Sequence, residues 1–244
     1  MKSIRLLSTN ISDTTIEEVS NLLNHKTHQK IAICNTNTLV RSHRENTIRN
    51  VINDFDIATP DGFPVAKSVS KLAKKNIARV DGYKVFLKTI EEGLKINTSH
   101  YFYGSNEKVV SLMINNLKKL YPDINIAGYN CPPNLSVEEL VADFKITSLN
   151  ISPQITWVCL GFPKQELFIH ALTKEFASST NYVGIGAVFE WVAGTKIKAP
   201  EWMANLGLEW VLRLIQEPKR LFKRYFIDNS LFVFYFFKQI TSKK

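Results

Sequence analysis

Residues 155–166 read Ile-Thr-Trp-Val-Cys-Leu-Gly-Phe-Pro-Lys-Gln-Glu, and this stretch decides the fold. Its first five residues are apolar or β-branched and predict a short buried strand. The strand opens onto Gly161, and Pro163 marks the start of a helix. A buried strand, a tight turn and a helix in this order are typical of a parallel sheet. The stretch therefore predicts one βα unit of an α/β fold, with a ligand site at its turn.

Five further short apolar runs alternate with longer segments of helical periodicity. The runs cover residues 31–34, 55–58, 100–103, 124–128 and 182–185. Capping residues predict helix starts at Ser12-Asp13, at Asn106 and at Ser136. The alternation predicts the α/β class, as a Rossmann-like parallel sheet wrapped by helices.

The composition limits the classes of protein to which the chain can belong. With 244 residues and 45% hydrophobic content, the chain can bury a substantial core. Thirty-one basic and 22 acidic residues give a formal charge of +9, which indicates an acidic partner such as a nucleotide, a phospholipid surface or a nucleic acid. The three cysteines form no CxxC pair, no apolar run reaches the ~20 residues of a membrane span, and the N-terminus does not resemble a signal peptide. We therefore expect a cytoplasmic protein.

Several polar residues and glycines directly follow predicted strands. They are Asn35, Asp61-Gly62, Gly104, Gly161 and Gly186. In a parallel sheet, ligands bind beyond the carboxyl ends of the strands, so we expect these positions to converge on one crevice. A glycine after a strand is also the ordinary requirement of a tight turn, so each glycine has a purely structural alternative.

Asp61 is the carboxylate of greatest interest. It follows a predicted strand and lies between Pro60 and Gly62, so its side chain is expected to point into the crevice. A carboxylate in that position can act as a general base. The alternative is an aspartate that forms the turn or caps the following helix, because Pro-Asp-Gly is a common turn tripeptide. The sequence leaves both interpretations open.

The turn and helix start at residues 161–166 are suited to a phosphate-bearing ligand. They offer backbone N–H groups, the Lys164 ammonium group and the Gln165 amide. The chain has neither a Walker loop nor a GxGxxG turn, so a nucleotide would need side-chain cations. The C-terminal segment supplies four of them: Arg213, Arg220, Lys223 and Arg224.

Asp54-Phe-Asp56 resembles the DxD element with which many nucleotide-sugar enzymes hold a divalent metal. It lies at the start of its predicted strand and is therefore expected at the end of the sheet opposite the crevice. The five histidines show no metal-ligand spacing. We expect neither a metal nor a cofactor.

The C-terminal segment has a different character. Residues 201–215 predict one helix, and from residue 213 onward eight basic residues against two acidic ones carry +6 of the total charge of +9. The apolar run at 231–237 is too short to span a bilayer. It suits either a membrane surface, with the upstream bases on anionic headgroups, or a core or oligomer interface. We divide the chain into an α/β catalytic core at 1–198 and a helical appendage at 199–244.

Short motifs recur along most of the chain in a fixed order and spacing. They are Asn35, Pro60-Asp61-Gly62, Arg79-Val-x-Gly82, Leu160-Gly161-x-Pro163-Lys-Gln-Glu166, Gly184-x-Gly186, Ala199-Pro200-x-Trp202 and Gly207-Leu-Glu-Trp-x-x-Arg213. Each motif is weak alone. Together they closely resemble the WecG/TagA/CpsF family of bacterial glycosyltransferases.

The resemblance implies an inverting, metal-independent glycosyltransferase that is peripheral on the inner face of the cell membrane. Its implied donor is a UDP-sugar carrying N-acetylmannosamine, its uronate or a related hexose. Its implied acceptor is a polyprenyl-diphosphate-linked sugar in the synthesis of teichoic acid, capsule or another cell-surface polysaccharide. The resemblance places the catalytic base at Asp61, and it places phosphate and membrane contacts at Arg213, Arg220, Lys223 and Arg224. The donor-binding residues that we expect are Asn35, Gly62, Arg79, Gly104, Gly161, Lys164, Gln165, Gly186 and Glu190.

The chain departs from the family pattern at Ile33, Lys84, Glu190 and Lys198. The largest departure is Lys84, a cation where many relatives carry Asp. A cation near the donor sugar would favour a uronate or a different hexose, so the resemblance leaves the sugar open.

The alternative function is a non-catalytic nucleotide- or nucleic-acid-binding protein with a basic tail. We do not expect nucleic acid as a partner, because the tail shows neither an RNP nor a helix-turn-helix pattern. A dinucleotide-dependent oxidoreductase would need fingerprint glycines and a ribose-binding acid that this sequence lacks.

Overall fold

A computed structural model describes residues 2–176 and 178–242, except for the side chain of Arg224. Within this part of the chain, six strands form a central sheet in which every neighbouring pair is parallel. The strands are β3 (Lys30–Cys34), β4 (Ile57–Pro60), β5 (Ser99–Gly104), β6 (Asn125–Asn130), β7 (Ile155–Cys159) and β8 (Asn181–Gly184). Their order across the sheet is β4-β3-β8-β7-β5-β6. All six predicted runs form strands, and the predicted Rossmann-like parallel sheet is confirmed.

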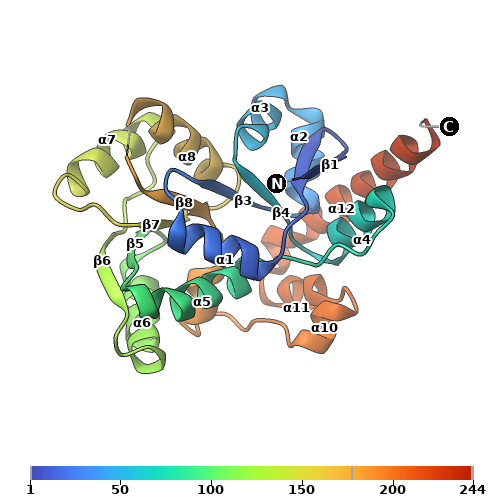
Figure 1. The fold of residues 1–244 in the computed structure, drawn as a ribbon. Coiled ribbons are helices and arrows are strands. Elements are labelled where there is room, and N and C mark those ends of the chain that lie inside the picture. The colour runs from blue at the N-terminus through green and yellow to red at the C-terminus, as the bar shows by residue number, and fades with distance from the viewer. Residues whose placement is uncertain (1, 177, 243–244) are drawn as a thin grey trace.

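Helices cover both faces of the sheet (Figure 1). One face carries α2 (Thr36–Arg44), α3 (Asn46–Asn53), α4 (Phe63–Ala73), α7 (Val137–Thr147) and α8 (Lys164–Glu175). The other carries α1 (Ile16–His25), α5 (Gly82–Gly93) with the short 3₁₀ helix η1 (Leu94–Ile96), α6 (Glu107–Leu120) and α9 (Val188–Val192). Successive residues of β7 serve the two layers: Trp157 packs in one core, 4.8 Å from the ring of Phe86, and Val158 packs in the other.

An N-terminal hairpin precedes this sheet and was not predicted. It pairs β1 (Ser3–Leu6) with β2 (Thr9–Ser12) in antiparallel fashion. The predicted helix start at Ser12-Asp13 is wrong by three residues, because Ser12 ends β2 and Thr15 caps α1 in a capping box with Glu18. The predicted starts at Asn106 and Ser136 are confirmed, since each side chain caps its helix.

Gly104 ends β5 at a point where no side chain fits. Its φ is +104°, and a Cβ atom there would lie 2.4 Å from the carbonyl oxygen of Cys159 in β7. Gly104→Ala is therefore expected to lower the free energy of unfolding by roughly 3 kcal/mol or more, because backbone strain adds to a clash with backbone. Gly194→Ala is the control: its φ is also positive, at +74°, but no atom lies within 4 Å. Urea denaturation of both variants measures the difference, and equal losses would show that the clash contributes nothing.

The C-terminal appendage consists of α10 (Glu201–Asn205), α11 (Glu209–Gln216) and α12 (Pro218–Thr241). The prediction of one helix over 201–215 is wrong. The helix breaks near Gly207, whose φ is +74° and where a Cβ would lie 3.0 Å from the ring of Phe63. The packing of this turn on α4 therefore requires a glycine.

The long helix α12 packs along α2 and extends to the right in Figure 1. The Asn37 amide donates to Asp228 at 2.6 Å. Near its other end, Gln239 accepts from the backbone N–H of Leu7 at 2.7 Å and donates to the carbonyl of Arg5 at 2.9 Å. The appendage is thus held against the α/β part at several points.

The apolar run at 231–237 has two different sides. Phe232 is only 2% exposed, and the ring of Tyr235 lies 4.5 Å from that of His43 on α2. Phe234 and Phe237, in contrast, are 61% and 57% exposed. One side of the run is thus part of the protein core and the other faces outward. Among the residues that the structure describes, no helix is long and apolar enough to cross a bilayer.

Candidate active site

Two cavities lie side by side at the carboxyl ends of the strands. The larger, here called the polar cavity, has a volume of about 410 Å³ and is bounded by the ends of β3, β4, β7 and β8 together with α11 and α12. The smaller, here called the aromatic cavity, has about 90 Å³ and lies between α4, α11 and α12. Both cavities are lined by Asn35, Asp61, Glu209 and Arg213.

Most of the predicted site residues reach these cavities. The polar cavity is lined by Asn35, Asp61, Gly161, Gln165, Gly186, Glu190, Arg213 and Arg220. The aromatic cavity adds Gly62 and Arg79. The structure therefore brings together residues that follow four different strands, as expected for the carboxyl edge of a parallel sheet.

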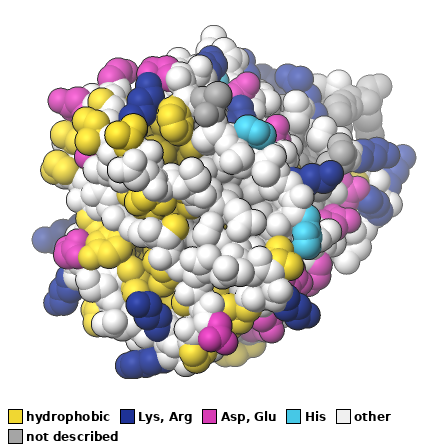
Figure 2. Space-filling model, turned by 60° about the vertical axis from the view of Figure 1, so that its left-hand side comes forward, with side chains coloured by type: hydrophobic (Ala, Val, Ile, Leu, Met, Phe, Trp, Pro, Cys, Tyr) yellow, Lys and Arg dark blue, Asp and Glu magenta, His cyan; other side chains and the backbone are white. Residues whose placement is uncertain are grey.

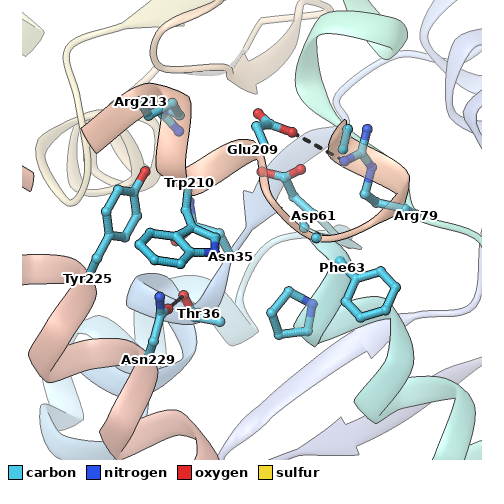
Figure 3. A pocket seen from close by; sticks show the side chains of 14 residues that line it. Asn35, Thr36, Asp61, Phe63, Arg79, Glu209, Trp210, Arg213, Tyr225 and Asn229 are labelled. Atoms are coloured by element: carbon cyan, nitrogen blue, oxygen red, sulfur yellow. Dashed lines mark hydrogen bonds and ion pairs between the residues drawn. The ribbon is translucent and has the colours of Figure 1, made fainter. Parts of the chain in front are cut away.

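Asp61 lies at the boundary of the two cavities. It directly follows β4, and its backbone N–H donates to the carbonyl of Cys34 at 3.0 Å. The residue that caps α4 is Gly62, so the interpretation of Asp61 as a helix cap is wrong. Figure 3 shows the Asp61 carboxylate directed toward the carboxylate of Glu209 on α11.

The surroundings of Asp61 weaken its acidity. Burial, followed by the negative charges of Glu209 and Asp81, raises the pKa of Asp61 from 3.8 to about 7, while Arg79 and Arg213 act in the opposite direction. A general base is most effective when its pKa lies near the working pH. Asp61 is therefore able to accept a proton near neutral pH.

Arg79 ties the appendage to the core beside Asp61. Its guanidinium group bonds Asp81 at 3.0 Å and Glu209 at 3.2 Å, and its side chain is largely buried. Asp81 also caps α5 by accepting from the backbone N–H of Lys84 at 3.0 Å. Arg79, predicted as a donor-binding residue, thus lines the aromatic cavity with its guanidinium group held by two carboxylates.

Three cations, Lys196, Arg213 and Arg220, line the polar cavity. Lys196 bonds Glu190 at 2.8 Å and Glu217 at 2.9 Å, and Arg220 bonds Glu217 at 2.6 Å. The Arg220 hydrogen bond, supported by Lys196, lowers the pKa of Glu217 to about 2 in spite of partial burial. Arg213 lies over the Trp191 ring, 5.3 Å from its centroid. A phosphate-bearing ligand would meet three basic side chains here.

Gln165 lies at the floor of the polar cavity. Its side chain is 4% exposed, accepts from the backbone N–H of Gly186 at 3.2 Å and donates to Glu166 at 2.8 Å. Asn35 uses its side-chain oxygen to cap α2. Both residues thus have structural roles at positions that also face a ligand.

Several predicted contacts lie elsewhere. Lys164 bonds Asn134 and the carbonyl of Leu135, each at 2.7 Å, and lines neither cavity. Gly104 is required by the approach of β5 to β7. Lys84 forms an ion pair with Glu201 of α10 and lines neither cavity, so its interpretation as a donor-sugar contact is not supported.

Two predicted phosphate or membrane contacts remain. Lys223 lies exposed on α12 and outside both cavities. The side chain of Arg224 lies outside the described part of the chain.

Lys196, Glu209 and Trp210 also line a cavity, although none of them was predicted as a site residue. Glu209 and Trp210 belong to a motif that was recognised, but nothing local indicates that α11 folds back over the end of β4. Lys196 pairs with Glu190, six residues earlier, across a turn. This spacing is typical of no regular element, so the pairing could not be predicted from the sequence.

The acidic pair Asp54-Phe-Asp56 lies away from the site, as predicted. Asp54 bonds Lys30 at 2.6 Å and His170 at 2.9 Å, at the amino end of β4. Across the described residues, no group of three or more His, Cys, Asp and Glu side chains is arranged to hold a metal ion.

An α/β fold with a polar cavity at its strand ends and cations along one wall is typical of enzymes that bind phosphate-bearing ligands. Residues 4–244 match the model of the glycosyl transferase WecG/TagA/CpsF family, and the chain belongs to this family. The predicted family relationship is therefore confirmed.

Three relatives carry the name N-acetylglucosaminyldiphosphoundecaprenol N-acetyl-beta-D-mannosaminyltransferase. A protein of Bacillus subtilis (strain 168) is 31% identical over 175 residues, which cover 70% of this chain and 65% of that protein. A protein of Bacillus spizizenii is 33% identical over 171 residues, covering 70% and 64%, respectively. A protein of Staphylococcus aureus (strain MW2) is 30% identical over 175 residues, covering 70% and 65%. The matched region thus spans slightly less than two thirds of these relatives.

Proposed function

We propose that the protein transfers N-acetylmannosamine or a related hexose from a UDP-sugar to a polyprenyl-diphosphate-linked N-acetylglucosamine. The observation that carries this proposal is the position of Asp61, a carboxylate of raised pKa at the boundary of two cavities. The names of the relatives support the acceptor and the transferred sugar.

The proposed reaction is a single displacement. Asp61 takes the proton of the acceptor hydroxyl while the hydroxyl oxygen forms a bond to the anomeric carbon of the donor. The bond from that carbon to the diphosphate breaks at the same time, and UDP leaves with the electron pair. Because the oxygen attacks opposite the leaving group, the configuration at the anomeric carbon is inverted.

The leaving diphosphate gains negative charge, which cations at the polar cavity can stabilise. Arg213, Arg220 and Lys196 line the polar cavity and supply positive charge for a metal-independent reaction. Glu190 and Glu217 hold Lys196 and Arg220 in place before the donor binds. The polar cavity is accordingly the proposed donor site.

We assign to residues 199–244 the role of an appendage that closes the donor site and contacts the inner face of the cell membrane. The outward side of α12 supports this role, because it carries exposed phenylalanines downstream of Lys219 and Lys223. Closure would exclude water from the donor and restrict transfer to the membrane where the acceptor lies.

The face drawn in Figure 2 offers no continuous basic surface to a nucleic acid. Lys and Arg side chains are scattered among Asp and Glu on this face. Arg220 and Lys196 are ion-paired at the polar cavity. Strong salt-dependent binding of RNA or DNA without affinity for UDP would favour the alternative.

Glu209→Gln is expected to move the acid limb of the pH–rate profile to lower pH. Glu209 raises the pKa of Asp61, so its neutralisation lets Asp61 ionise at lower pH. Asp81 continues to raise that pKa, and Arg79 and Arg213 continue to lower it. Initial transfer rates between about pH 5 and pH 9 measure the limb, which is expected near pH 7 in the wild type. Glu201→Gln removes another ion pair between core and appendage and should leave the profile unchanged.

The proposed function is tested by incubating the protein with a panel of UDP-sugars and an N-acetylglucosaminyl diphosphate carrying a prenyl chain. Mass spectrometry identifies the lipid-linked product, and thermal shift identifies donors that stabilise the folded state by mass action. Transfer of an N-acetylhexosamine is expected. Binding of no UDP-sugar and formation of no lipid-linked product would reject the proposal.

A further inference from the structure

The aromatic cavity is distinct in character from the polar cavity beside it. Phe63, Trp210 and Tyr225 contribute three aromatic rings, and Thr36 and Asn229 contribute polar groups. Figure 3 shows Trp210 and Phe63 on two sides of this space with Asp61 between them. Aromatic side chains with a few fixed polar groups are typical of a pocket that binds a small polar ring.

The Asn229 amide is held in one orientation. Thr36 donates from its hydroxyl to the side-chain oxygen of Asn229 at 2.8 Å. In Figure 3, the amide nitrogen of Asn229 consequently turns toward Trp210. An N–H donor beside an indole face suits a ligand with both an apolar ring face and a carbonyl or hydroxyl oxygen. An N-acetylated hexose has these groups.

The geometry of the displacement reaction also indicates which cavity holds the donor and which holds the acceptor. The acceptor must approach the anomeric carbon from the side opposite the leaving diphosphate, so the acceptor and the diphosphate lie on opposite sides of that carbon, with the base beside the acceptor hydroxyl. The cations Lys196 and Arg220 line the polar cavity only, whereas Arg79, which lines only the aromatic cavity, is paired with both Asp81 and Glu209. This difference assigns the diphosphate of the donor to the polar cavity. The aromatic cavity remains for the acceptor.

Exposed apolar side chains adjoin one of the residues that line the aromatic cavity. Leu206 and Leu208 flank Gly207, which lines the cavity, and they are 64% and 39% exposed. The prenyl chain of an acceptor bound in the cavity could extend along this surface without being buried in the protein.

We propose that the aromatic cavity is the subsite for the acceptor sugar, in which Trp210 supports the ring of an N-acetylated hexose and Asn229 donates to one of its oxygen atoms. This inference rests on the proposed function, because it assumes a lipid-linked sugar as the acceptor. It assigns to Trp210 and Asn229 the selection of the acceptor and not of the donor.

The test measures binding of N-acetylglucosaminyl diphosphate carrying a geranyl chain, by isothermal titration calorimetry in the presence of UDP. Trp210→Ala is expected to weaken this binding by about tenfold or more, as expected for loss of an aromatic contact at a binding site. The affinity for UDP should not change, which also shows that the variant is folded. Trp202→Ala is the matched control, because Trp202 lies on α10, is 59% exposed and lines neither cavity.

Two conservative variants separate direct contact from a structural effect. Trp210→Phe keeps an aromatic face and should retain most of the affinity, whereas Asn229→Asp keeps the shape but removes the donor and should weaken binding. Unchanged acceptor affinity in both Trp210→Ala and Asn229→Asp would overturn the subsite. A wild-type protein that binds this acceptor but transfers no sugar would instead overturn the proposed function, so the two failures are distinct.

Discussion

Asp61→Asn is expected to lower the rate of sugar transfer by about 10²- to 10⁴-fold, which is the usual contribution of a positioned general base. The amide has nearly the same shape as the carboxylate but cannot take the proton of the acceptor hydroxyl. The affinity for UDP should be retained, because the cations of the polar cavity remain in place. Radiolabel transfer to the lipid acceptor measures the rate, and calorimetry measures UDP binding.

The control for this variant is Asp123→Asn, which changes an exposed carboxylate outside both cavities. It should transfer sugar at the wild-type rate. An Asp61→Asn protein that is also fully active would show that another group, such as Glu209, accepts the proton.

The same substitution has an expected effect on stability. The folded-state pKa of Asp61 is raised from 3.8 to about 7, so ionisation of this group opposes folding. The folded state therefore loses stability as the pH rises between these two values. Asp61→Asn removes this loss, and its gain in stability should grow from pH 5 to pH 8, with an upper limit of about 4 kcal/mol. Urea denaturation at both pH values measures it, and an equal or smaller gain at pH 8 would contradict the raised pKa.

The second large effect concerns the membrane. Phe226, Phe234 and Phe237 are 59%, 61% and 57% exposed on the outward side of α12. Serine at all three positions is expected to weaken binding to anionic phospholipid vesicles by about 100-fold or more, because burial of one such side chain contributes about 1.5–3 kcal/mol. Sedimentation with vesicles measures the loss.

The position of the bases strengthens this expectation. Lys219 and Lys223 precede Phe226 at helical spacing, so they lie on the same side of α12 and can contact anionic headgroups. The thermal stability of the triple variant should not change, since its side chains are already exposed.

The control is Ile146→Ser with Leu149→Ser near α7, where both side chains are more than 70% exposed. These positions are distant from α12 in Figure 1, and vesicle binding should be retained. Equal binding of the triple variant and the wild type would show that α12 does not contact the membrane.

The predictable part of the fold was local in sequence. A buried strand such as β7 is recognised from its own residues, and its packing on both faces follows from alternation of side chains. The start of β4 was placed two residues early, because Phe55 still closes the last turn of α3 through its bond to Ile52. The break near Gly207 was missed although its signal is local: Gly207 ends α10 at a φ of +74°, its N–H donates to the carbonyl of Ala204, and the N–H of Leu208 donates to that of Met203.

The site residues that could be predicted from the sequence are those that directly follow a strand. Asp61, Gly161 and Gly186 reach the polar cavity because the ends of parallel strands share one edge. Lys164 has the charge that a phosphate ligand requires, but its ammonium group bonds Asn134 and the carbonyl of Leu135 in the segment before α7. The role of Glu209 depends on how the appendage packs, which no pattern within its own helix reveals.

The anomeric configuration of the product decides whether Asp61 acts in a single displacement. Nuclear magnetic resonance of the lipid-linked disaccharide, made by the wild-type protein from an α-linked UDP-sugar, determines it. We predict a β-linked product and no sugar bound covalently to the protein. An α-linked product, or a glycosylated form of the enzyme on the reaction path, would contradict a mechanism in which Asp61 serves as the base.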